Sequence, residues 1–145
     1  MIDQLILDNK PSNYLVTSTD LNNRYSMVTK KICSEMDIKE DEIVNNPDIR
    51  YTSLPLIDKT GKAVSSISNE DLLLNNYGLV DNVDSYKIGS EITINQIRDI
   101  IAFTQISAHK NKKLVIINDA SKMNKEASSA LLKTLEEVSS NCSFI

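Results

Sequence analysis

Residues 112–145 decide the fold, and they read KKLVIINDASKMNKEASSALLKTLEEVSSNCSFI. Residues 114–117 (LVII) are wholly apolar and rich in β-branched side chains, which is typical of a parallel strand covered on both faces. Asn124 is placed to cap a following helix. The apolar stripe of that helix is Ala127, Ala130, Leu131, Leu135 and Val138. Residues 143–145 (SFI) begin another strand, so the segment predicts a βαβ unit of a parallel α/β sheet.

The preceding sequence supplies further strands and helices of the same kind. Residues 13–17 (NYLVT) predict a buried strand, and residues 50–57 (RYTSLPLI) predict a second one, with Pro55 indicating an edge or a bulge near its end. Residues 21–36 predict a helix on the spacing of Tyr25, Val28, Ile32 and Met36. Residues 93–109 predict a helix that opens with a capping box and whose apolar face comprises Ile94, Ile97, Ile100, Ile101, Phe103 and Ala108.

Residues 58–90 are the least regular part of the chain. Residues 59–62 (KTGK) predict a turn, and the polar, Asn-rich stretch after them predicts an excursion from the core. One short helix and local disorder both remain open for it. A parallel sheet rarely finishes on its incoming strand, so we expect residues 1–145 to form a single, incomplete domain.

Composition excludes several classes of protein. The 145 residues are 41% apolar and 25% charged with a net charge of −4, which suits one globular domain and not a basic nucleic-acid binder. Cys33 and Cys142 match no zinc or redox spacing, so free thiols in a reducing compartment are expected. His109 is expected at a helix end rather than as a ligand. The N-terminal residues lack a signal-peptide or membrane-span pattern, and we expect a cytoplasmic protein.

A phosphate-binding loop would follow the first strand with the form G-x-x-x-x-G-K-[ST]. The equivalent stretch is residues 18–25 (STDLNNRY), and Asp20 adds a negative charge to it. Side chains at the glycine positions would crowd the backbone amides that surround a phosphate, and a phenol is a poor magnesium ligand. Ser18 and Asn23 occupy the two glycine positions, Arg24 occupies the lysine position and Tyr25 the hydroxyl position. We therefore expect that this stretch does not bind ATP.

The second half of such a site would follow residues 114–117. A hydrolase places one carboxylate there to hold magnesium and another to position water. This chain has Asn118 and Asp119. The favoured interpretation is a polar strand-to-helix turn with no catalytic role. A non-nucleotide Rossmann-like enzyme is a further possibility, but no nucleophile paired with a base supports it.

These residues together resemble the clamp-loader branch of the AAA+ proteins. Residues 112–137 are similar to its strand, D-E-A-like turn and helix ending in A-L-L-K-T-L-E-E, while residues 46–49 (NPDI) resemble its H-P-D motif and residues 92–101 (ITINQIRDII) its I-x-x-I-R-x-[IL] helix. The resemblance implies a P-loop NTPase-like (AAA+/RecA-type) parallel sheet with helices on both faces, truncated before the end of the sheet. It also implies that lid and collar domains lie outside this chain.

Within that family, the degenerate loop resembles that of the delta-prime subunits of bacterial DNA polymerase III. The resemblance implies a non-catalytic stator that works with the gamma/tau and delta subunits, which use ATP to place a sliding clamp on primed DNA. The family's four-cysteine zinc module has no counterpart in residues 37–45, so no zinc is expected. The S-R-C motif that carries the family's arginine finger is also not in this chain.

Six lysines fall between His109 and Lys133, against only two acids. A solvated face is favoured over contact with DNA phosphates or a neighbouring subunit, for which the candidates are Lys122, Lys125 and Lys133.

Two other functions stay open. One is a divergent, weakly active clamp-loader ATPase that uses Arg24 and Asp119, and the other is an interaction module of a phage or mobile-element loader.

Overall fold

A three-stranded parallel sheet forms the centre of the molecule. The computed structural model describes residues 5–7, 13–63, 87–110, 112–137 and 141–145. The strands are β3 (Ile49–Thr52), β6 (Lys113–Ile117) and β7 (Cys142–Phe144), in the order β3-β6-β7. Tyr51 pairs with Ile116, and Val115 pairs with Phe144. Strand β6 is the central strand, and its side chains enter an apolar cluster on each face of the sheet, which explains why its sequence is an unbroken apolar run after its first residue.

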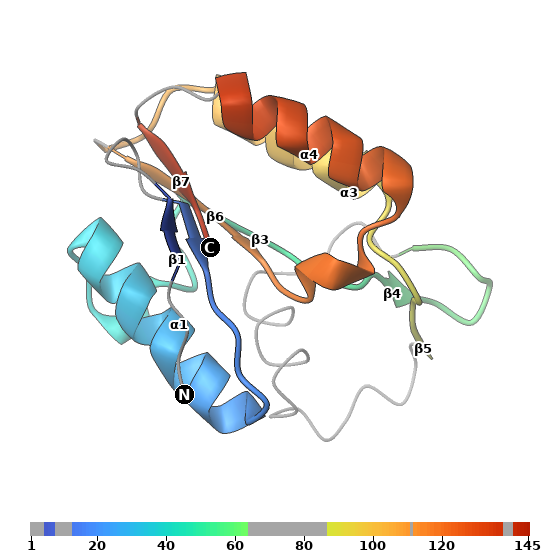
Figure 1. Cartoon of the computed structure of the whole chain (residues 1–145), viewed down its shortest axis with the longest axis horizontal. Helices are drawn as coiled ribbons and strands as arrows, with labels where there is room; N and C mark the ends of the chain where they lie inside the picture. Colours follow the sequence, from blue (N-terminus) through green and yellow to red (C-terminus); the bar gives the residue numbers. More distant parts are fainter. Residues whose placement is uncertain (1–4, 8–12, 64–86, 111, 138–140) are drawn as a thin grey trace.

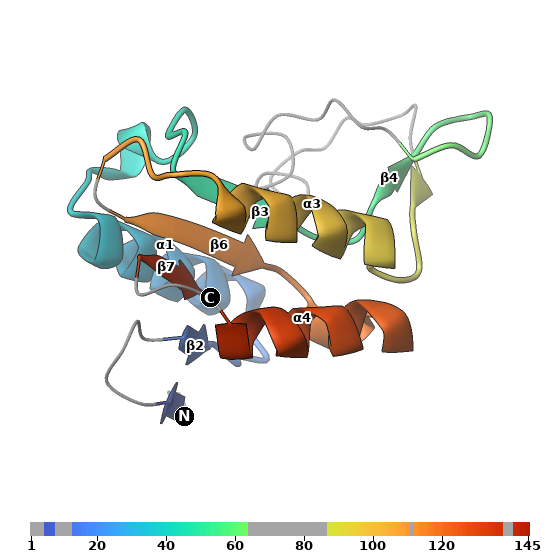
Figure 2. The same ribbon diagram turned by 90° about the horizontal axis from the view of Figure 1, so that it is seen from above.

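Helices cover both faces of this sheet, as the sequence predicts. Helices α3 (Ile94–Gln105) and α4 (Lys125–Glu137) pack side by side on one face, and α1 (Leu21–Met36) lies against the other (Figure 1). Viewed from above, the α3–α4 pair is in front of β6 and α1 lies behind it (Figure 2). One apolar cluster lies under α3 and α4 and is centred on Ile97, Ile100, Val115 and Phe144. A second cluster lies under α1 and is centred on Ile32, Tyr51, Leu114 and Ile116.

Local caps set the starts of the helices. The backbone N–H of Thr93 donates to Gln96 Oε1 at 3.0 Å, which confirms the predicted capping box of α3. The backbone N–H of Ala127 donates to Asn124 Oδ1 at 2.9 Å, which confirms the predicted cap of α4. Helix α1 has the predicted bounds.

The predicted C-terminal end of α3 at His109 is wrong. The helix ends at Gln105, because Ile106 is extended (φ −81°, ψ 143°). The side-chain ammonium of Lys113 donates to the backbone carbonyls of Phe103 and Ile106, so a residue from β6 satisfies the acceptors exposed at that helix end.

The strand predicted over residues 50–57 is two strands in two sheets. Strand β3 ends at Thr52, and β4 (Leu56–Ile57) pairs antiparallel with β5 (Lys87–Ile88) in a separate sheet. Pro55 lies between them, and its missing N–H donor explains why the ladder does not continue through it. The predicted turn at residues 59–62 is present, with Gly61 at φ +84°. The rest of the predicted excursion, residues 64–86, lies outside the described residues.

The predicted first strand forms over residues 13–15 only. Its predicted burial is wrong, because Asn13 and Tyr14 are half-buried and Leu15 is exposed, and the strand does not extend the parallel ladder. Strand β2 (Asn13–Leu15) pairs antiparallel with β1 (Leu5–Leu7). A hydrogen bond to a side chain connects β2 to β7: the backbone N–H of Phe144 donates to Asn13 Oδ1 at 3.1 Å. Short 3-10 helices occupy Glu40–Glu42 and Ala120–Lys122. None of the helices within the described ranges is long and apolar enough to cross a membrane.

Candidate functional site

A pocket of about 480 Å³ opens at the carboxyl end of β6. Strand β2 and the segment after it form one wall, and α1, α4 and the last residues of β6 and β7 form the others. The pocket brings together four of the six positions that the sequence assigns to a degenerate nucleotide site, namely Ser18, Arg24, Asn118 and Asp119. Asn23 and Tyr25 lie in the first turns of α1 and are not among its lining residues.

The segment that would form a phosphate loop instead begins a helix. Helix α1 starts at Leu21, so only residues 16–20 connect it to β2. Asp20 is the N-cap residue, and its Oδ1 accepts hydrogen bonds from the backbone N–H groups of Asn22 at 2.9 Å and Asn23 at 3.4 Å. The amides that an anion would need at a helix N-terminus are therefore bonded to the chain's own carboxylate.

Arg24 and Asp119 meet beside the pocket. Arg24 Nη1 lies 3.7 Å from Asp119 Oδ1, and the two side chains are 20% and 33% exposed. The Nε atom of Arg24 is buried and has no hydrogen-bond partner among the described residues. Asp119 has a left-handed backbone (φ 54°, ψ 49°), an uncommon conformation for a residue with a side chain. The pair links α1 to the carboxyl end of the central strand.

Asn118 is buried where β6 ends, with 6% of its surface exposed. Its backbone N–H donates to the carbonyl of Thr52 at 2.9 Å, which adds one bond to the β3–β6 ladder. Its side-chain amide donates to Asp119 Oδ2 at 3.3 Å. These contacts suit the predicted polar turn between strand and helix, and a neutral amide here is a weaker magnesium ligand than a carboxylate.

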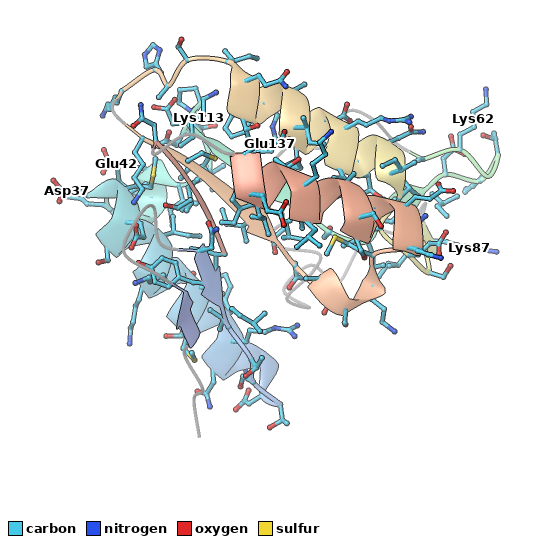
Figure 3. All side chains as sticks on the ribbon, turned by 45° about the horizontal axis from the view of Figure 1, so that its top comes forward. Asp37, Glu42, Lys62, Lys87, Lys113 and Glu137 are labelled. Carbon is cyan, nitrogen blue, oxygen red and sulfur yellow. The ribbon has the colours of Figure 1, made fainter. Side chains whose placement is uncertain are left out.

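The six lysines do not form one basic surface. Lys113 is buried beside the last turn of α3 (Figure 3), so the solvated face expected of the six lysines is wrong for this one. Lys112 donates to Glu35 Oε2. The three lysines that the sequence proposes for DNA or subunit contact are exposed, namely Lys122, Lys125 and Lys133.

Two charged clusters in the fold were not predicted from the sequence. Glu35 accepts from Tyr14 Oη at 2.6 Å and from Lys112, with Lys31 Nζ at 3.4 Å. Burial alone would raise the pKa of Glu35, but the hydrogen bonds from Lys112 and Tyr14 and the charge of Lys31 outweigh it, and the pKa is lowered. The i,i+4 spacing of Lys31 and Glu35 is readable in the sequence. Tyr14 and Lys112 come from distant segments of the chain, so their contacts with Glu35 cannot be read from the sequence.

The second cluster is built on Asp48, the acid of the H-P-D-like motif. Asp48 is 3% exposed, and its two carboxylate oxygens accept from the backbone N–H groups of His109 at 2.6 Å and Lys110 at 2.8 Å. His109 therefore lies in the α3–β6 connection rather than at a helix end. The motif has a structural role here, because it holds that connection against the start of β3.

Neither cysteine takes part in a site in the described structure. Cys33 and Cys142 are both free thiols. Cys142 is buried, which raises its pKa to about 11, while Cys33 is half-buried. The described residues contain no group of three or more His, Cys, Asp or Glu side chains able to hold a metal ion.

Comparison with known proteins identifies the family. A family model described as "DNA polymerase III, delta subunit" matches residues 15–145. The chain belongs to the delta-prime family of clamp-loader subunits. This confirms the resemblance seen in the ALLKTLEE helix and its neighbours. The three-stranded parallel sheet with helices on both faces (Figure 1) confirms the predicted α/β fold class.

Two curated proteins are similar to this delta-prime family member. The Replication factor C small subunits of Methanosarcina mazei and Methanosarcina acetivorans are 33% and 32% identical over 104 residues, which is 70% of this chain. The matched region spans only 30% of the length of either relative. The crystal structure of a DNA polymerase III gamma subunit-related protein from Thermotoga maritima matches with a TM-score of 0.38 and 20% identity, over 83% of this chain and 37% of that one.

Proposed function

We propose that this chain belongs to the stationary, non-catalytic subunit of a DNA polymerase III clamp loader. In this role it pairs with gamma/tau and delta subunits. The catalytically active gamma/tau subunits bind ATP, and the assembled complex places the sliding clamp on primed DNA. It contributes to the polymerase holoenzyme without catalysing a reaction itself. One observation carries the proposal, namely that the Asp20 carboxylate occupies the amides at the start of α1, where a triphosphate would need them.

The rest of the pocket supports the same conclusion. Arg24 stands in the position of the phosphate-binding lysine, but its charge is opposed by Asp119 at 3.7 Å. Asn118 provides a neutral amide where a magnesium-binding carboxylate is needed. Tyr25 is held in the first turns of α1, outside the pocket lining. Phosphoryl transfer depends on positioned cations and a cradle of amides, and each of these parts is altered here.

Titration with ATP and MgCl₂ tests the absence of nucleotide binding. We expect no measurable binding by isothermal titration calorimetry up to millimolar ATP, with an active gamma/tau subunit as the positive control. Binding at low micromolar concentration would contradict the proposal. A reconstitution test with gamma/tau and delta subunits should use the whole protein that carries this domain. Omitting it is expected to reduce clamp loading, although the other subunits still hydrolyse ATP.

The exposed lysines are the proposed contact with DNA or a neighbouring subunit. Lys122 precedes α4 and Lys125 begins it, so both lie near the positive end of a helix dipole. We expect the double variant Lys122→Glu/Lys125→Glu to weaken assembly or DNA-stimulated activity, with a smaller salt dependence than the parent protein. The charge-matched control is Lys59→Glu/Lys62→Glu, in the exposed turn after β4 (Figure 3). Equal effects in the two variants would indicate that Lys122 and Lys125 are ordinary solvent-exposed lysines with no specific contact.

A divergent ATPase is the second candidate. The observation in its favour is that Arg24 and Asp119 line the same pocket and approach within 3.7 Å. In this case the protein would show slow, magnesium-dependent ATP turnover, and Asp119→Ala would abolish it. Turnover that is absent, or that survives this substitution, would remove this candidate.

A further inference from the structure

We propose that residues 13–18 form a strap that covers the outer edge of β7 and opens as a unit while the rest of the domain stays folded. The strap comprises β2 and the residues that lead from it toward α1 (Figure 1). Within the described residues, the backbone ladder of the parallel sheet joins β3, β6 and β7 and does not include the strap. The fastening of the strap is therefore separate from the hydrogen bonds of the sheet. This inference does not depend on the proposed function.

Strand β7 lies at one edge of the parallel sheet. Ile145 bonds to β6 on the inner side, because its N–H donates to the Val115 carbonyl at 2.9 Å and its carbonyl accepts from the Ile117 N–H at 2.8 Å. Alternate residues of a strand direct their backbone groups to opposite sides, so the N–H of Phe144 points outward. That N–H donates to a side chain of the strap, Asn13 Oδ1, at 3.1 Å. The strap thus covers a strand edge of the kind that native proteins protect.

Tyr14 supplies the second fastening. Its hydroxyl donates to Glu35 Oε1 at 2.6 Å, and Lys31 Nζ lies 3.7 Å from the centroid of its ring. Both partners belong to α1, and Glu35 also accepts from Lys112 before β6. A hydrogen bond to a carboxylate is stronger than one between neutral groups. Two neighbouring strap residues, Asn13 and Tyr14, are therefore tied by their side chains to β7 and to α1.

Burial adds little to these contacts. None of residues 13–18 is buried, and Leu15 is 54% exposed. Val16 packs against the apolar cluster under α1 but is only partly buried. The centre of the sheet differs, since Leu114 is 0% exposed. Segments with few buried apolar contacts open at a lower free energy than the core of a domain.

Opening of the strap would change the surface of the domain in two ways. It would free the outward N–H of Phe144, and it would remove one wall of the pocket at the end of β6, because residues 13–18 line that pocket without interruption. Ile116 and Leu131 are among the apolar side chains on the other walls. The closed strap therefore shields a strand edge and apolar surface that another extended chain could pair with.

Amide hydrogen exchange, measured by NMR on the whole protein that carries this domain, tests the strap. Phe144 and Ile145 are neighbours in the chain, but the N–H of Phe144 bonds to the strap and that of Ile145 bonds to β6. After correction for intrinsic exchange rates, we expect Phe144 to exchange at least tenfold faster than Ile145. The reason is that opening of the strap alone breaks only the first of these two bonds.

Tyr14→Phe removes the hydroxyl that binds Glu35 and keeps the ring beside Lys31. We expect exchange at Phe144 to become about tenfold faster, as the loss of one hydrogen bond to a charged acceptor shifts the opening equilibrium by about that factor. Circular dichroism checks that the variant is folded.

The matched control is Lys112→Met, which removes a different hydrogen bond to Glu35 and leaves the strap residues unaltered. The contact between Lys112 and Glu35 persists when only the strap opens, so exchange at Phe144 should not change. Exchange at Leu114, whose N–H donates to the Asp48 carbonyl in the centre of the sheet, should become faster because that amide opens with the whole domain.

Each outcome decides the inference. Equal protection of Phe144 and Ile145 would overturn it, because the strap would then open only together with the sheet. An unchanged rate at Phe144 in Tyr14→Phe, or an equal acceleration there in Lys112→Met, would also overturn it. None of these results bears on nucleotide binding, so the proposed function stands or fails by its own titration.

Discussion

Replacing Asp48 with alanine should destabilise this domain more than any surface change. The Asp48 carboxylate is buried and bonded to the backbone N–H groups of His109 and Lys110 at 2.6 and 2.8 Å. A hydrogen bond to a charged group contributes about 1.5–3 kcal/mol, so losing two costs about 3–6 kcal/mol. Domains are stable by only about 5–15 kcal/mol, so Asp48→Ala should be marginally folded. Asp48→Asn keeps one acceptor and should lose about half as much.

Urea unfolding followed by circular dichroism measures this loss as a shift in the midpoint at constant slope. Hydrogen exchange provides the local readout, because the amides of His109 and Lys110 should lose protection in Asp48→Ala before the centre of β6 does. The control is Asp99→Asn, an exposed carboxylate on α3. A loss of less than about 0.5 kcal/mol, which is the usual effect of a surface substitution, would refute the role given to Asp48.

Three further predictions follow from other buried groups. Glu35→Gln should lower the free energy of unfolding by about 1–3 kcal/mol at pH 7. The folded-state pKa of Glu35 is lowered, so the loss of stability is fully present above the ordinary glutamate pKa of about 4.3. The loss fades as pH falls through the folded-state pKa. Urea unfolding of the parent and the variant at pH 7 and pH 3 checks this pH dependence. Cys33 should react with a thiol reagent at pH 8 before Cys142, whose pKa of about 11 and burial protect it until denaturant is added; equal native rates would contradict this. Lys113→Met should cost about 1–3 kcal/mol by leaving two carbonyls at the end of α3 without their donor, measured by the same unfolding assay.

Local sequence signals determined most helix starts and the central strand. The Thr93–Gln96 capping box and the Asn124 cap act within one helical turn, so their residue types alone specify them. The apolar run in β6 predicts burial on both faces, because no solvated face would permit it. The same kind of reasoning predicts that residues 18–25 do not bind phosphate, because a phosphate-binding loop needs glycines and a lysine that this stretch lacks.

Pairing between distant segments was decided only by the tertiary structure. Asp48 contacts residues 61 and 62 positions away in the sequence, and Glu35 contacts Lys112 at a separation of 77. No pattern of period two or 3.6 identifies such partners. The burial of Lys113 and the early end of α3 have the same cause, because a side chain from β6 satisfies the carbonyls of another element.

The sequence by itself determined that residues 18–25 lack the glycines, lysine and small hydroxyl residue of a phosphate-binding loop and that the surrounding elements form a parallel α/β domain. Only the folded chain decided that Asp20 occupies the start of α1 and that Arg24 meets Asp119, because a charge is opposed by whichever group the fold brings near it. Chemical type is readable along the chain, whereas electrostatic neighbours are a property of the three-dimensional packing.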